Sequence, residues 1–147
     1  MVTSQQCVDR YGAPDGAFER KWMVVWVPPP NITALPRRIY CHRQLRPMLA
    51  QACDYIIERG LVEQVRTWDG CFNVRAKKGG VSLSLHSWGL AVDVNAAWNG
   101  FGQVPTMSPG LVACFTDAGF TWGGTWKKPD GMHFEPKVLP QEQKEQA

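Results

Sequence analysis

The sequence lacks the features that define several common classes of protein. Its 147 residues contain no apolar run close to the roughly 18 residues that a membrane span needs, so we expect no stable membrane insertion. The Lys and Arg residues are scattered, form no basic stripe, and leave a formal net charge of only +3. Because nucleic-acid binders normally concentrate such residues on one face, we expect no nucleic acid among the partners.

A secretory signal and the spacing of a zinc knuckle are also missing. The N-terminus has no basic segment followed by an apolar one, so we expect synthesis in the cytoplasm without an export signal. The five cysteines are odd in number, and no two have the C-x-x-C spacing of a zinc knuckle. We therefore expect them to be mostly reduced and buried.

What remains is the composition of an ordinary globular protein. Hydrophobic residues make up 44% of the chain and charged residues 20%, and the length suits one compact domain. We expect a single monomeric domain over residues 1–147. Residues 1–20, which are polar and contain Gly and Pro, are expected to form an irregular arm, and residues 137–147 a frayed tail.

The clearest predicted element is an amphipathic helix over about residues 43–59. Its apolar residues recur at intervals of three and four positions, which places them on one face of a helix. Pro47 fits only the first turn, and Gly60 supplies a C-terminal stop. A second, shorter helix is expected from Ser108, as its N-cap, to about Ala118.

Segments rich in β-branched and aromatic residues indicate the strands. These segments cover residues 21–29, 61–68, 71–75, 91–95, 120–124 and 132–136. Several strands with one long and one short helix predict an α+β domain with a mostly antiparallel sheet.

Two of the three histidines lie in the segments richest in functional residue types. His86 belongs to S-x-H-x-x-G-x-A-x-D over residues 84–93, and His133 to D-x-x-H-F-E over residues 130–135. Buried histidine and aspartate must be paired, hydrogen-bonded or bound to a metal. Two neutral imidazoles together with the Asp93 carboxylate would form a three-ligand set that leaves one position for water, as in catalytic zinc sites.

Two further charged residues fit such a site. Asp130 lies three residues before His133, where its carboxylate can take a proton from a water whose pKa the metal lowers to about 7. Arg75 precedes the first motif and can hold a substrate carbonyl or carboxylate with its planar guanidinium. Taken singly, a histidine in a strand is more commonly structural, an Asp after a Pro is more commonly a turn former, and an Arg at the end of a strand is more commonly solvated. The joint pattern favours the functional interpretation.

Two motifs of the sequence resemble those of a known family. SLHSWGLAVD together with DGMHFE resembles the signature of the zinc peptidoglycan peptidases, which include D-alanyl-D-alanine carboxypeptidases and dipeptidases. The pattern most resembles the L-alanyl-D-glutamate peptidases that phages use as endolysins, whose fold is shared with the hedgehog signalling domain. The similarity runs from about Trp68 to Pro136 and includes WDGCFNVR and FTWGGTW.

The resemblance implies roles for individual residues of this chain. One zinc ion per chain would be held by three ligands, His86, Asp93 and His133. Asp130 would be the general base, and Arg75 would polarise the scissile carbonyl and stabilise its oxyanion.

Two more residues receive supporting roles. The resemblance implies that Ser84 lines the site or binds substrate. Glu135 shares a strand face with His133, and we expect it to make a supporting hydrogen bond to that ligand. Some relatives carry Glu at the position of the base, so Glu135 is the alternative base, although the geometry favours Asp130.

The predicted function is hydrolysis of the peptidoglycan stem peptide between L-alanine and D-glutamate. A D-alanyl-D-alanine carboxypeptidase would use the same site, and a non-catalytic zinc-containing binding domain would use the same ligands. A cysteine hydrolase built on Cys71 or Cys114 is a remote alternative, because neither thiol has a recognisable nucleophile context. The resemblance also predicts an endolysin of phage or prophage origin, made in the bacterial cytoplasm and released onto the wall through a holin pore.

Overall fold

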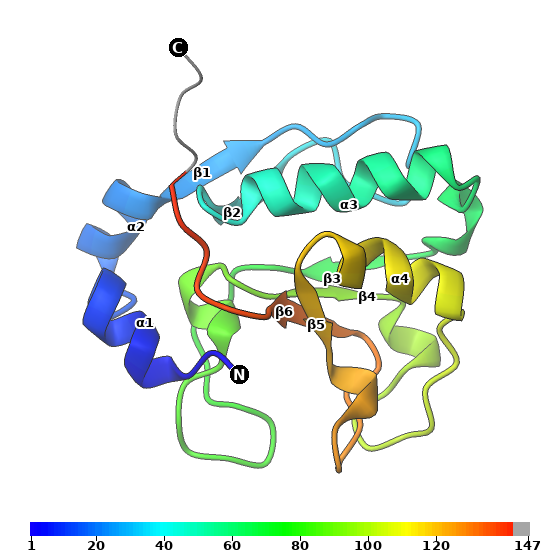
Figure 1. The fold of residues 1–147 in the computed structure, drawn as a ribbon. Coiled ribbons are helices and arrows are strands. Elements are labelled where there is room, and N and C mark those ends of the chain that lie inside the picture. The colour runs from blue at the N-terminus through cyan, green and yellow to red at the C-terminus, as the bar shows by residue number, and fades with distance from the viewer. Residues whose placement is uncertain (143–147) are drawn as a thin grey trace.

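The fold combines two antiparallel sheets with helices, as the computed structural model of residues 1–142 shows (Figure 1). A two-stranded sheet lies beside the N-terminal helices, and a four-stranded sheet lies below the long helix in the view of Figure 1. The predicted α+β class with antiparallel pairing is therefore confirmed. No helix among the described residues is long and apolar enough to cross a membrane.

Two helices occupy most of the first 22 residues, so the prediction of an irregular arm over residues 1–20 is wrong. α1 (Ser4–Tyr11) begins with a capping box, in which the Thr3 hydroxyl accepts from the Gln6 backbone and the Gln6 side chain accepts from the Thr3 backbone. α2 (Gly16–Trp22) begins at Asp15, whose carboxylate accepts from the Phe18 backbone N–H. Short capped helices escape a search for long apolar periodicity.

The small sheet pairs one predicted strand with one that the sequence analysis missed. β1 (Met23–Trp26) lies inside the predicted segment 21–29 and ends before its prolines, which cannot donate to a sheet. β2 (Ile39–His42) pairs antiparallel with β1, with Met23 opposite His42. β2 was missed because it is only four residues long and directly follows two charged residues, Arg37 and Arg38.

The long helix has the predicted apolar face. α3 (Arg46–Glu58) starts three residues later than predicted, because residues 43–45 form a turn before it. Pro47 lies in the first turn and Gly60 follows the end with φ +69°. The buried residues of this helix are Leu49, Ala52, Cys53 and Ile56.

The four-stranded sheet places the two motif strands at its centre. Its order is β3 (Trp68–Gly70), β4 (Val92–Val94), β6 (His133–Pro136) and β5 (Phe120–Trp122), and every neighbouring pair is antiparallel. The register puts Asp93 directly opposite His133. Two candidate ligands are therefore cross-strand neighbours, whose Cβ atoms lie about 4.5–5.5 Å apart in such pairs.

Two predicted strands of this region are wrong. Residues 61–68 contain a 3₁₀ turn (Val62–Gln64) and reach the sheet only at β3. Residues 71–75 form no strand, because their backbone bonds instead to the turn that carries His86: Asn73 N donates to the His86 carbonyl at 3.0 Å, and Arg75 N donates to Ser87 Oγ at 3.1 Å.

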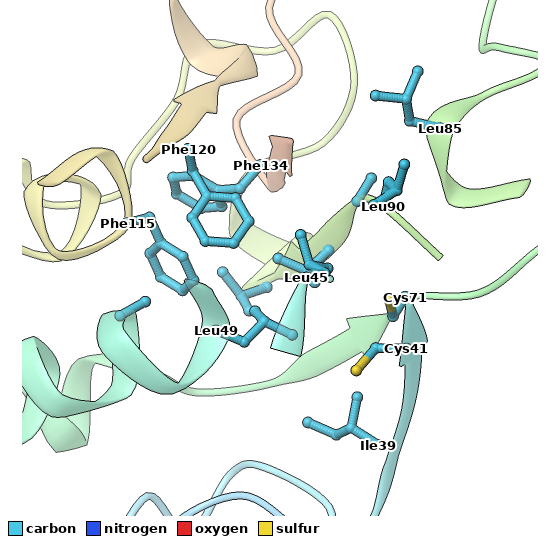
Figure 2. Close-up of a cluster of buried hydrophobic side chains, with 14 of the residues drawn as sticks. Ile39, Cys41, Leu45, Leu49, Cys71, Leu85, Leu90, Phe115, Phe120 and Phe134 are labelled. Carbon is cyan, nitrogen blue, oxygen red and sulfur yellow. The ribbon is translucent and has the colours of Figure 1, made fainter. Parts of the chain in front are cut away.

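The core lies between α3, the helix α4 (Pro109–Asp117) and the four-stranded sheet (Figure 2). α4 begins at Ser108 as predicted, whose hydroxyl accepts from the Leu111 backbone N–H. The Phe115 ring from this helix stacks on Phe134 of β6 with centroids 4.2 Å apart. This stacking packs β6, the strand that carries His133, against α4.

The C-terminal segment is held against the N-terminal region as far as the structure describes it. Arg10 Nη1 donates to the Pro140 carbonyl at 3.1 Å, and Arg43 Nε donates to Glu142 Oε1 at 2.6 Å. Residues 137–142 are therefore anchored where a frayed tail was predicted. The rest of that predicted tail, residues 143–147, lies outside the described residues.

Candidate metal centre

A short turn presents the first histidine. His86 lies in a 3₁₀ turn (Leu85–Trp88), and the Ser84 hydroxyl begins this turn by accepting from the His86 backbone N–H at 3.2 Å. Gly89 then turns the chain into β4 with φ +64°. A Cβ at this glycine would lie 2.7 Å from the Met23 side chain and 2.9 Å from a backbone nitrogen, so only glycine fits.

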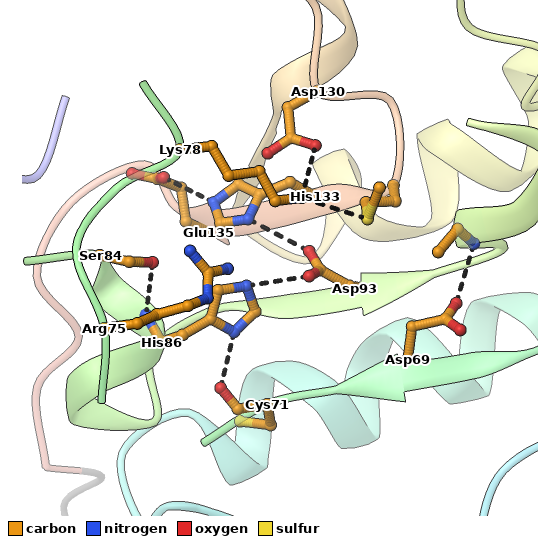
Figure 3. A network of polar contacts seen from close by, with 12 residues as sticks. Asp69, Cys71, Arg75, Lys78, Ser84, His86, Asp93, Asp130, His133 and Glu135 are labelled. Carbon is orange, nitrogen blue, oxygen red and sulfur yellow. Dashed lines mark hydrogen bonds and ion pairs between the residues drawn. The ribbon is translucent and has the colours of Figure 1, made fainter. Parts of the chain in front are cut away.

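The three candidate ligands converge at the centre of the sheet (Figure 3). Asp93 Oδ2 lies 3.2 Å from His86 Nε2, and Asp93 Oδ1 lies 3.3 Å from His133 Nδ1. One ligand atom from each residue lies within 4.8 Å of the other two, and all three residues are buried. The structure thus brings together the three residues that the sequence analysis selected, in a group that could hold a metal ion.

The protonation of His86 leaves a nitrogen lone pair free for a metal. Its Nδ1 lies 2.7 Å from the Cys71 carbonyl oxygen, which can only accept, so Nδ1 carries the hydrogen. Nε2 of the neutral ring then has a lone pair. Nε2 is buried and has no hydrogen-bond partner, although Asp93 Oδ2 is near. An orphaned acceptor of this kind costs about 1–3 kcal/mol unless something binds it, and a divalent cation would.

His133 is oriented by carboxylates on both sides. Its Nδ1 faces Asp93, and its Nε2 lies 2.8 Å from Glu135 Oε1. Burial alone would lower the pKa of His133, but hydrogen bonds to Asp93 and Glu135 raise it to about 9. Burial would likewise raise the pKa of Asp93, but the hydrogen bond from His133 and the nearness of His86 hold it well below its usual range. The two shifts have one cause, which is the close approach of imidazole and carboxylate groups at this site.

Glu135 lies where the supporting hydrogen bond was expected. A carboxylate that accepts from the remote nitrogen of a histidine fixes the ring orientation and increases its basicity toward a metal. The contact to Nε2 occupies Glu135 and leaves Asp130 as the less committed of the two candidate bases. Both roles remain predictions.

Asp130 is buried beside the ligands. Its Oδ1 has no hydrogen bond but forms an ion pair with Lys78 Nζ at 3.7 Å. The backbone holds it in place, because Asp130 N donates to the Gly123 carbonyl at 2.9 Å and its own carbonyl accepts from His133 N at 3.1 Å. A side chain at Gly123 would collide with that backbone at 2.6 Å.

Arg75 has its backbone fixed and its guanidinium largely uncommitted. Its N–H and carbonyl both bond to Ser87 Oγ, at 3.1 and 3.2 Å. The guanidinium bonds only to the adjacent Ala76 carbonyl, and no carboxylate among residues 1–142 forms an ion pair with it. It is therefore available to a substrate oxygen.

Two cavities meet at the ligands, and Arg75 lines both. The first, of about 420 Å³, is also lined by Ser84, Asp130, His133 and Glu135. The second, of about 260 Å³, is also lined by Asp69, Asn73, His86 and Asp93. All seven residues proposed for the site thus face one or the other cavity.

Two contributors escaped the sequence analysis. The Cys71 carbonyl sets the tautomer of His86, but a backbone oxygen leaves no mark in residue type. Lys78 approaches Asp130, and the only available signal was its place in a doublet just before the first motif.

The thiols do not resemble nucleophiles. Burial raises the pKa of Cys71 well above its usual value, and its Sγ donates to the Gly89 carbonyl at 3.4 Å. Burial also raises the pKa of Cys114, which lies in α4 within the core. A reactive cysteine requires a lowered pKa, so the cysteine-hydrolase alternative gains no support.

Comparison with known proteins assigns a likeness to the segment that carries the site. Residues 77–136, less than half of the chain, match the family model described as D-alanyl-D-alanine carboxypeptidase. This segment includes the three candidate ligands and Asp130, but Arg75 precedes it. No curated protein matches the chain. No solved structure matches it either, so the likeness to the hedgehog domain remains a prediction.

Proposed function

We propose that this chain is a zinc-dependent peptidoglycan peptidase that hydrolyses the stem peptide between L-alanine and D-glutamate. The observation that carries the proposal is the convergence of the buried His86 Nε2, which has no hydrogen-bond partner, with Asp93 and His133. Asp130 lies beside them with an Oδ1 that also has no hydrogen bond. The matched family model supports a zinc metallopeptidase of the cell wall in general.

The donor set suits zinc. His86 Nε2, the Asp93 carboxylate and His133 Nδ1 would hold the ion, and three protein ligands leave a coordination position for water or substrate. When bound, zinc would act as a Lewis acid on the scissile carbonyl and lower the pKa of water to about 7.

The protein side chains divide the remaining work. Asp130 takes the proton of the attacking water on its Oδ1, which has no hydrogen bond, and returns it to the leaving amine. The Arg75 guanidinium holds the carbonyl oxygen as negative charge develops there. Glu135 keeps the His133 ring aligned, and the Ser84 hydroxyl holds the turn that presents His86.

The choice of an internal bond is supported by the two cavities. Room exists on both sides of the ligands, so a peptide can extend beyond the cleaved bond in both directions. Release of a terminal D-alanine needs room for only one residue on the leaving side. The carboxypeptidase remains the second candidate, because the matched family model carries that description.

The proposed setting is that of an endolysin of phage or prophage origin. The chain would be made in the bacterial cytoplasm and would reach the wall through a holin pore. The support for this part is the resemblance of the two motifs to phage L-alanyl-D-glutamate peptidases.

Digestion of purified peptidoglycan by the zinc-loaded protein tests the proposal. We expect new N-terminal glutamate, detected by amine labelling and by mass spectrometry of the muropeptides. Release of free D-alanine with no new glutamate terminus would identify the carboxypeptidase. Stoichiometric zinc binding with neither product would identify a non-catalytic zinc domain. Hydrolysis that persists in chelator would contradict the metal mechanism.

A further inference from the structure

The first cavity carries several basic side chains. Besides Arg75 it is lined by Lys77, Lys78 and Lys128. We call the part formed by Lys78, Phe101 and Lys128 the basic arm. The second cavity has no lysine among its lining residues, which include Asp69 and Asn73. The two sides of the candidate metal centre therefore differ in charge.

Phe101 gathers the two ammonium groups of the basic arm. Lys128 Nζ lies 4.7 Å and Lys78 Nζ 5.6 Å from the centroid of this ring. Lys78 forms an ion pair with Asp130 at 3.7 Å, whereas Lys128 forms no ion pair with any carboxylate of residues 1–142. The charge of Lys128 is thus uncompensated and lies over an aromatic ring beside a second lysine, which favours an anionic ligand.

The position of Asp130 gives the direction of the substrate. Asp130 lines the basic cavity and is absent from the lining of the second one. In the proposed reaction Asp130 returns the proton to the leaving amine, so the leaving nitrogen must lie close to Asp130, in the first cavity. The part of the substrate that leaves as an amine therefore extends into the basic arm, and the part with the scissile carbonyl extends toward Asp69 and Asn73.

We propose that the basic arm binds a free carboxylate on the residue that follows the scissile bond, with Lys128 and Lys78 as specificity-determining residues. This inference rests on the proposed function and adds the chemistry of the leaving residue. In a stem peptide, D-glutamate after L-alanine carries its α-carboxylate two bonds from the scissile nitrogen. A peptide in which that group is a carboxamide would lose the ionic contact.

Two synthetic peptides test the inference directly. Both contain L-Ala-γ-D-Glu-L-Lys, and they differ only in whether the D-glutamate α-group is a carboxylate or a carboxamide. We expect the zinc-loaded wild type to cleave the acid with a kcat/KM at least about tenfold higher, as charged hydrogen bonds are stronger than neutral ones. Equal kcat/KM values for the two peptides would overturn the inference.

Neighbouring lysines provide a matched pair of variants. Lys127 and Lys128 are both exposed, but only Lys128 lines the cavity. Lys128→Gln should raise KM for the acid much more than KM for the carboxamide and so reduce the preference, whereas a general structural defect would lower cleavage of both peptides alike. Lys127→Gln removes the same charge and should keep the full preference. The double variant Lys78→Met with Lys128→Gln should lose the preference, and its retention there would overturn the inference.

Binding separates this inference from the proposed function. Calorimetry on the zinc-loaded Asp130→Asn variant, which should hydrolyse neither peptide, measures the affinity for the same two peptides without turnover. Tighter binding of the acid, lost in Lys128→Gln and kept in Lys127→Gln, supports the basic arm even when neither peptide is cleaved. Equal affinities overturn it. Absence of cleavage alone counts against the proposed peptidase.

Discussion

Two buried histidines of this protein have opposite surroundings. His42 in β2 is fully buried beside the rings of Tyr11 and Trp22, with centroids 4.5 and 5.3 Å from its own. His86 lies beside a carboxylate and a second histidine. In both residues Nε2 is buried without a hydrogen-bond partner. An orphaned imidazole nitrogen is therefore not sufficient to indicate a metal site.

The difference lies in which nitrogen carries the hydrogen. His42 Nδ1 accepts from the Gln44 backbone N–H at 3.0 Å, so in the neutral ring the hydrogen is on Nε2. That N–H points among aromatic rings, whose faces are only weak acceptors. His86 has the reverse tautomer, because its Nδ1 donates to a carbonyl. Only His86 offers a lone pair at the orphaned position, and only there do further ligand atoms converge.

Removal of each histidine should give the largest contrast. We expect His86→Ala to lose stoichiometric zinc binding and all zinc-dependent hydrolysis, since the remaining two ligands cannot form the three-ligand set. His42→Asn should keep one zinc per chain, because Asn can accept from Gln44 as the His42 ring does. Zinc content after gel filtration, with circular dichroism as the control for folding, measures both. Retained zinc in His86→Ala would refute the ligand assignment.

Asp130 tests catalysis separately from metal binding. Asp130→Asn keeps the shape of the side chain and removes its basicity, so we expect kcat to fall by about 10²–10⁴-fold while zinc content stays at one. Steady-state hydrolysis of muropeptides, together with metal analysis of the same sample, gives the comparison. Full activity in this variant would show that another group is the base, and Glu135 would be the first candidate.

Two glutamates extend the contrast between the surroundings of the two histidines, and we expect an effect of intermediate size on zinc affinity. Glu135 accepts from His133, whereas Glu142 bonds to Arg43 and Gln44 near His42. We expect Glu135→Gln to weaken zinc binding by about 10–100-fold, the range found when a hydrogen-bond partner of a metal ligand is removed. Glu142→Gln makes the same chemical change and should leave the affinity unaltered. Competition with a zinc-binding dye measures both, and an equal effect in the two variants would contradict a specific role for Glu135.

The parts of the site that could be predicted are those that residue types and their spacing reveal. His86, Asp93 and His133 were predicted because rare residue types stood at characteristic spacings, and the antiparallel register then placed Asp93 opposite His133. The tautomer of His86 could not be predicted, because it depends on the Cys71 carbonyl, and every residue type has one. The basic arm also escaped, since Lys78 and Lys128 are 50 positions apart and meet only through Phe101.

The fold shows the same division. α3 and α4 were predicted because a periodic apolar face or a Ser-Pro start is local information. The segment 71–75 has strand-like residues but bonds to the His86 turn, and this tertiary arrangement overrides its local preference. α1 was missed although Thr3 and Gln6 form a capping box, a local signal that could have been used.

The acid sensitivity of folding should also differ between the two histidines. Burial, with a contribution from Arg43, lowers the pKa of His42 to about 3, against an unfolded value near 6.5. Between these values the unfolded chain binds a proton that the folded chain does not. The free energy of unfolding should therefore decrease as pH falls through this window, by at most about 1.4 kcal/mol per pH unit from this residue.

His42→Asn removes this contribution while keeping an acceptor for Gln44. Urea denaturation of the metal-free protein between pH 7 and 3 should give a shallower pH dependence for the variant, even if its stability at pH 7 is lower. His86→Ala is the appropriate control, because it removes a buried histidine but leaves His42 and its aromatic neighbours in place, so the steep acid dependence due to His42 should persist. Parallel slopes for wild type and His42→Asn would show that His42 is not neutral in the folded protein, and the contrast between the two histidines would then have to be redrawn.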